Sequence, residues 1–67
     1  MMQLSRGTMS IRTIVADDDP AILDLVTKDL ESMGLEVMRA DNGVMLIELV
    51  ANQGPFDLII TDISMPW

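Results

Sequence analysis

The sequence predicts an α/β fold in which three parallel strands, in the order 2-1-3, are connected by two helices. Two short apolar stretches, Ile11 to Ala16 and Leu58 to Thr61, are too brief for helices and rich in β-branched residues. Two longer segments follow residues that typically begin helices. Strands that alternate with helices through short connections form parallel sheets with right-handed crossovers.

The first strand, 11–16, is the most apolar and is therefore expected at the centre of the sheet. It runs directly into Asp17, Asp18 and Asp19, which Pro20 follows. Asp19 is the predicted N-cap, because Asp before Pro at the first helical position is a strong helix start. Asp17 and Asp18 then fall in the connection from strand to helix. Three consecutive acids are also typical of a solvated loop, and that alternative stays open.

The first helix is predicted from Pro20 to about Met33, where Gly34 supplies a left-handed stop. Asp24 and Lys28 stand four residues apart and are expected to pair on the outer face. A stripe of apolar residues is expected to face the core: Ile22, Val26, Leu30 and Met33.

The next strand, 35–40, carries Glu36 and Arg39, so it is expected at an edge of the sheet. The turn and capping residues Asp41, Asn42 and Gly43 lead into the second helix, roughly 44–52. That helix is apolar on almost every side, and Glu48 is its only charged residue. A helix on one sheet face needs only one apolar stripe. This helix is therefore expected either to be buried on several sides or to meet a partner.

With 67 residues, the chain is long enough for one small domain at most. Residues 1–10 are predicted to form a mobile tail or an extension. The chain has no Cys and no His, which excludes disulfides and thiolate or imidazole metal sites. Four basic against eleven acidic residues give a net charge of −7, which argues against direct binding of nucleic acid or anionic membranes. Since the sequence lacks a membrane-spanning run and a signal-peptide core, a cytoplasmic, soluble protein is expected.

The strand order brings three acidic side chains to one rim of the sheet. The carboxyl ends of neighbouring parallel strands lie about 4.8 Å apart, so Asp17, Asp18 and Asp62 are expected side by side. Three carboxylates repel one another unless a cation lies among them, and oxygen ligands alone suit magnesium. One carboxylate is then available as a nucleophile toward a phosphoryl group. The alternative for Asp62 is a solvated residue that ends a strand before a proline turn.

Three stretches in this order resemble the amino-terminal half of a receiver (CheY-like) domain of two-component response regulators: VADDDPAI, DNG and DLIITDISMP. The resemblance covers about 11–67 and implies a flavodoxin-like fold. A complete receiver continues for further strands and helices, with a switch Thr or Ser, an essential Lys and a switch aromatic. None of these follows Trp67, so 11–67 is expected to be a truncated receiver in which phosphotransfer and switching are in doubt.

The resemblance also implies a role for each site residue. Asp62 matches the phosphoacceptor, and Asp17 and Asp18 match the acidic pair that holds Mg²⁺ directly or through water. Ser64 matches the residue that lends its backbone carbonyl to the ion. A histidine kinase or a phosphotransfer protein is the implied phosphodonor. The chain is expected to accept phosphate without being an enzyme, with only weak self-phosphorylation or dephosphorylation.

Residues of the remaining motif positions are implied to be structural: Asp19, Pro20, Asn42, Gly43 and Asp57, with Met65 and Pro66 in the turn after the acceptor.

Two further functions compete with the receiver. The first is a non-phosphorylated dimerisation or docking module, because the third strand, 58–61, would be a bare apolar edge that pairs antiparallel with a second copy to give a homodimer. The second is a magnesium-dependent phosphatase of the phospho-aspartate kind. Such enzymes resemble a motif with another Asp two residues after the nucleophile, where this chain has Ser64.

Overall fold

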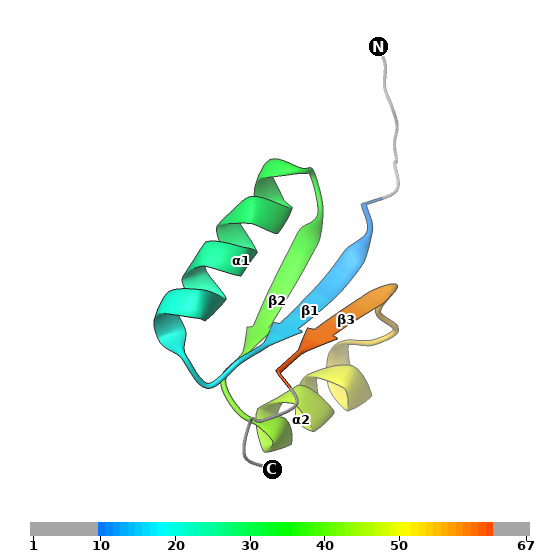
Figure 1. Cartoon of the computed structure of the whole chain (residues 1–67). Helices are drawn as coiled ribbons and strands as arrows, with labels where there is room; N and C mark the ends of the chain where they lie inside the picture. The colour runs from blue at the N-terminus through cyan, green and yellow to red at the C-terminus, as the bar shows by residue number, and fades with distance from the viewer. Residues whose placement is uncertain (1–9, 63–67) are drawn as a thin grey trace.

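The computed structural model describes residues 10–62 and forms one three-stranded sheet with two helices (Figure 1). The expected tail therefore lies almost wholly outside the described residues, as do Ser64, Met65 and Pro66. In chain order the elements are β1 (Arg12–Ala16), α1 (Pro20–Ser32), β2 (Glu36–Ala40), α2 (Gly43–Gln53) and β3 (Leu58–Thr61).

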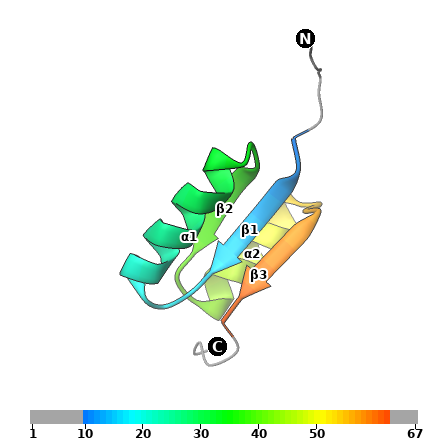
Figure 2. The same ribbon diagram turned by 45° about the horizontal axis from the view of Figure 1, so that its top comes forward.

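All strands are parallel, and their order is β2-β1-β3, which confirms the predicted topology. The central strand aligns Ile14 with Met38 of β2 and with Ile59 of β3. Figure 2 shows α1 and α2 on opposite sides of the sheet. Among residues 10–62, neither helix is both long and apolar enough to cross a membrane.

The core has two layers because successive side chains of β1 point to opposite faces of the sheet. Ile14 and Ala16 are buried in one cluster with Ala40 of β2 and Leu46 of α2. The alternate residues of β1, Thr13 and Val15, are also buried and point to the face that α1 covers, where Leu23 and Thr27 are the buried residues of the helix. β1 is thus covered on both sides, as its continuous apolar character predicted.

The predicted apolar stripe of α1 is only partly correct. Ile22 is exposed and Met33 is 66% exposed, beyond the end of the helix at Ser32. The helix buries Leu23 and Thr27 instead, so its inner face is rotated by about one residue from the one expected. Apolar residues stand on two sides of this helix, and the short connection from β1 decides which side meets the sheet.

The helix ends follow the local chemistry that was predicted. The Asp19 side chain accepts a hydrogen bond from the Ala21 amide at 2.9 Å, and the Asn42 side chain accepts one from the Met45 amide at 2.8 Å. Gly34 follows α1 with φ of +89°, the left-handed conformation expected for a stop.

The expected pair of Asp24 with Lys28 is wrong. Asp24 pairs with Arg39 of β2 at 2.6 Å instead, because an arginine on the neighbouring strand reaches this face of α1. The pair links α1 to the strand beneath it. It is half-exposed, so its contribution to stability is small.

β3 is the least covered strand among the described residues. No Cα atom of either helix lies within 8 Å of a Cα atom of β3, and Leu58 and Ile59 are 42% and 48% exposed. Its outer edge has no neighbouring strand in the described part of the chain. α2 also exposes large apolar side chains, including Ile47 at 60%. The described residues therefore do not bury the second helix on several sides.

Candidate functional site

The three predicted acidic residues emerge at one end of the sheet. Asp17 follows β1 directly, and its amide donates to the Ala40 carbonyl of β2 at 3.1 Å. Asp62 follows β3, and its amide donates to the Ala16 carbonyl at 3.1 Å. The backbone of both residues thus continues the sheet ladder by one step, which holds the two side chains at a defined separation. Asp18, the next residue after Asp17, lies in the connection to α1.

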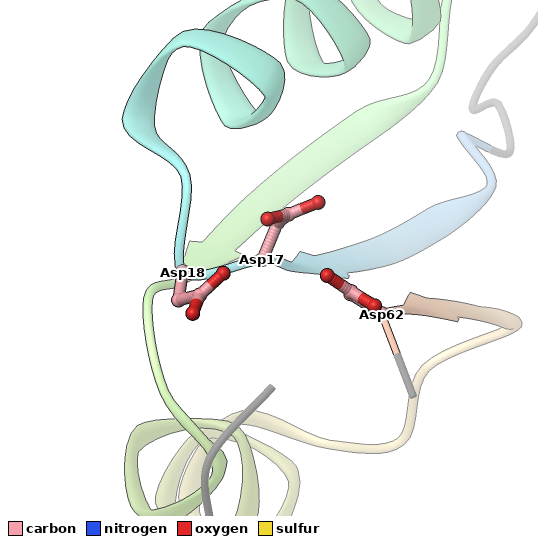
Figure 3. A group of neighbouring side chains, drawn as sticks. All are labelled: Asp17, Asp18 and Asp62. Carbon is pink, nitrogen blue, oxygen red and sulfur yellow. The ribbon is translucent and has the colours of Figure 1, made fainter. Parts of the chain in front are cut away.

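Figure 3 shows the side chains of Asp17, Asp18 and Asp62 converging from the ends of β1 and β3. One carboxylate oxygen of each lies within 4.8 Å of the others. Asp17 and Asp62 are half-buried, and Asp18 is exposed. The juxtaposition predicted from the strand order is therefore present.

The donor set fits a divalent cation that prefers oxygen. Opposite ligands of octahedral Mg²⁺ stand about 4.2 Å apart, given bond lengths of 2.0 to 2.1 Å. One oxygen of each carboxylate lies within 4.8 Å of the others, a spacing close to that range, so the three side chains are near enough to share one ion. Alternatively, one of them would bind through water, and Asp18 is the most exposed of the three.

Local hydrogen bonds divide the acidic run into separate roles. The Asp19 amide donates to Asp17 Oδ1 at 2.9 Å, which orients that carboxylate and leaves its second oxygen available to a ligand. The Asp19 side chain is occupied as the cap of α1. Asp19 is accordingly absent from the group of acids that converge at the rim. Ser64, whose carbonyl was expected at the ion, lies outside the described residues.

The contacts made by Arg12 were not predicted from the sequence. Arg12, at the start of β1, donates to the carbonyls of Gln53 and Pro55 and lies over the ring of Phe56. The one feature of the sequence that could have indicated these contacts is an arginine at the start of an otherwise apolar strand. Its partners are backbone carbonyls, however, and sequence patterns do not identify these.

Comparisons with known proteins agree with this geometry. Residues 13–67 match the family described as the response regulator receiver domain. The sensor histidine kinase GacS of Pseudomonas protegens is 40% identical over 55 residues, which are 82% of this chain and 6% of that protein. The uncharacterised transcriptional regulatory protein YrkP of Bacillus subtilis is 41% identical over 58 residues, which are 87% of this chain and 24% of that protein.

A third relative is the DNA-binding dual master transcriptional regulator RpaA of Synechocystis, 42% identical over 55 residues, which are 82% of this chain and 22% of that protein. The chain spans a quarter or less of the length of these relatives. No solved structure matches the chain. The family match covers most of the sequence and includes both strand ends that carry the acids. The chain therefore belongs to the response regulator receiver domain family.

Proposed function

We propose that this chain is a phosphoacceptor module of two-component signal transduction in the cytoplasm, and that Asp62 accepts the phosphoryl group from a histidine kinase or a phosphotransfer protein. The observation that carries the proposal is the convergence of Asp62 with Asp17 and Asp18 at the rim of the sheet. Relatives named as a sensor histidine kinase and as transcriptional regulators support the same signalling context. In this role the chain is a substrate of the donor and not an enzyme.

The chemistry is a phosphoryl transfer to a carboxylate. An oxygen of Asp62 forms a bond to phosphorus while the bond between phosphorus and the donor atom breaks, and the donor leaves with that electron pair. Asp17 and Asp18 would hold Mg²⁺, which when bound supplies positive charge against the phosphoryl oxygens. Asp62 is half-buried at the rim, so the acceptor is accessible to a donor and partly shielded from water.

Reaction with acetyl phosphate and Mg²⁺, followed by intact-mass measurement, tests the acceptor. The parent chain is expected to gain the mass of one phosphoryl group, and Asp62→Ala is expected to lose that gain. Asp41→Ala is the matched control, because Asp41 follows β2 at the same end of the sheet and does not belong to the converging group. A parent that is never modified under conditions where a complete receiver is modified would contradict the proposal.

A second candidate, a non-phosphorylated dimerisation or docking module, is favoured by the uncovered third strand. β3 has one strand neighbour within the described residues, no Cα atom of either helix lies within 8 Å of its own, and its Leu58 and Ile59 side chains are exposed. Unpaired backbone groups on a short apolar strand form a template for pairing with another chain. We propose a second copy of this chain as the occupant, joined by antiparallel pairing of the two β3 strands.

A further inference from the structure

Two residues join the starts of β1 and β3, at the end of the sheet opposite the three aspartates (Figure 1). The Asp57 amide donates to the Arg12 carbonyl at 2.7 Å, and the Arg12 amide donates to Asp57 Oδ2 at 2.9 Å. In a regular parallel ladder a backbone carbonyl accepts from such an amide, and here the carboxylate takes its place. We call this reciprocal pair of hydrogen bonds the Arg12–Asp57 clasp.

The side chain of Arg12 fixes the segment that leads to Asp57. One terminal guanidinium nitrogen donates to the Gln53 carbonyl at 2.6 Å and to the Pro55 carbonyl at 2.8 Å. The guanidinium carbon lies 4.8 Å from the centre of the Phe56 ring. Hydrogen bonds from a charged donor are stronger than those from a neutral one, and the cation–π contact adds a further attraction. The end of α2 and the connection to β3 are thereby held against β1, which presents the Asp57 carboxylate to the Arg12 amide.

The rest of β3 does little to determine its own alignment with β1. Its first three residues, Leu58, Ile59 and Ile60, are large aliphatic side chains of similar size, and none of them is buried. No Cα atom of either helix lies within 8 Å of a Cα atom of the strand. Ile60 is half-buried and its neighbour Ile59 is exposed, so a slip that puts Ile59 in the place of Ile60 would cover a side chain of the same kind. Burial therefore gives this strand little preference between these two registers.

That register decides whether the acids meet. Continued by one residue past each end, the observed alignment of β1 with β3 sets Arg12 beside Asp57 and Asp17 beside Asp62. Side chains alternate between the two faces of a sheet, so a slip of one residue would turn Asp62 to the face opposite Asp17. The two ends of β3 are therefore coupled through the strand.

We infer that Asp57 is a positioning residue: its carboxylate, by accepting from the Arg12 amide, selects the register of β3 that places Asp62 beside Asp17. This inference rests on the proposed function, because the register has a functional consequence only if the rim binds magnesium and accepts phosphate. The clasp acts through the alignment of two strands and contacts neither the ion nor the phosphoryl group.

Two variants at Asp57 distinguish the effect of where the acceptor oxygen lies from the effect of the negative charge. Asp57→Asn keeps an acceptor oxygen in the same place and removes the charge, whereas Asp57→Glu keeps the charge and displaces the carboxylate by one methylene. Asp29→Asn and Asp29→Glu are matched controls on the exposed face of α1. Each is compared with the full 67-residue parent by nuclear Overhauser contacts between strands and by titration with Mg²⁺.

The parent, Asp57→Asn and both controls are expected to show contacts between Ile14 and Ile59, as in the structure. Asp57→Glu is expected to show contacts of Ile14 with Leu58 or Ile60, and to bind Mg²⁺ more weakly by about tenfold or more, as is typical when an outer residue that orients a ligand is changed.

The inference is overturned if Asp57→Glu keeps both the parental contacts and the parental magnesium affinity. If that variant does not fold, Asp57→Asn decides: a folded protein with the parental register supports the clasp, and a shifted register overturns it. A parent that binds no Mg²⁺ would contradict the proposed function, while the strand contacts would still report on the clasp. The two failures are therefore distinguishable.

Discussion

At the scale of single residues, three adjacent aspartates have three different environments. Asp17 is half-buried and oriented by the Asp19 amide, Asp18 is exposed, and the Asp19 side chain caps α1. Their sequence neighbourhood is almost the same, so the differences come from where β1 ends and α1 begins. Only the first two converge with Asp62.

We predict that magnesium stabilises the parent through these carboxylates. At a concentration about ten times its Kd, a ligand that binds only the folded state raises the free energy of unfolding by about 1.4 kcal/mol. Thermal unfolding with and without millimolar Mg²⁺ measures this gain. The double variant Asp17→Ala with Asp18→Ala should lose it, and Asp29→Ala with Glu31→Ala, which removes the same charge from α1, should keep it. Equal shifts in the two double variants would place the ion elsewhere.

A second residue-scale prediction concerns two hydroxyls in the core. Thr13 and Thr27 are buried, and their Oγ1 atoms have no hydrogen-bond partner among the described residues. An unsatisfied buried hydroxyl costs about 1 to 3 kcal/mol. Thr27→Val has nearly the same shape, so we expect it to raise the free energy of unfolding by about 1 kcal/mol in urea titration.

Thr61→Val, at an exposed position, is the control and should change the free energy of unfolding by less than about 0.5 kcal/mol. A clear loss of stability in Thr27→Val would mean that its hydroxyl is satisfied in solution by a buried water.

At the scale of elements, hydrogen bonds between residues close in sequence end α1. The Gly34 amide donates to the Glu31 carbonyl at 3.0 Å, and the Leu35 amide donates to the Leu30 carbonyl at 3.2 Å. Together with the positive φ of Gly34, these two hydrogen bonds form a Schellman motif. The motif reverses the chain into β2 and so determines where the second strand starts.

Gly34→Ala should lower the free energy of unfolding by about 1 to 2 kcal/mol, the cost of a left-handed conformation for a residue with a β-carbon. A β-carbon at this position would meet nothing within 4 Å, so the cost is conformational and not steric crowding by neighbours. Gly34→Asn should recover part of the loss, because Asn tolerates this conformation better. Equal stabilities for the three proteins, measured by urea titration, would contradict this account.

At the scale of the whole molecule, the described residues cover the central strand β1 far better than the edge strand β3. β1 is covered on both faces, whereas Leu58 and Ile59 of β3 are exposed and the outer edge of β3 is unpaired in the described part of the chain. Antiparallel pairing of β3 with a second β3 would continue the sheet through both copies. It would also place the two acidic rims at opposite ends of the seam, which keeps their negative charges apart.

We therefore predict a homodimer of the isolated chain that depends on β3. Ile59→Lys should abolish it by placing a charge at the edge, as lysines do in natural edge strands. Leu25→Lys is the matched control, since Leu25 is 59% exposed on α1, away from the seam. Sedimentation equilibrium over a wide concentration range measures both, and a folded monomer throughout would contradict the dimer.

The strands and helices, their order in the sheet and the acidic rim could all be predicted from the amino-acid sequence. The helix starts at Asp19 and Asn42 and the helix stop at Gly34 depend only on neighbours within a few residues. They can therefore be predicted from local sequence. The rim was also predictable, because the central position of β1 follows from its apolar composition, and parallel strands end at one edge.

The buried face of α1, the partner of Asp24 and the alignment of β3 depend on tertiary packing and could not be predicted from the sequence. Apolar residues stand on two sides of α1, and the packing of the helix on the sheet chooses Leu23 over Ile22. The alignment of β3 rests on contacts of Arg12 with an amide, two carbonyls and a carboxylate distant in sequence. Such contacts leave no periodic pattern, because they form only when the strands and the end of α2 have come together.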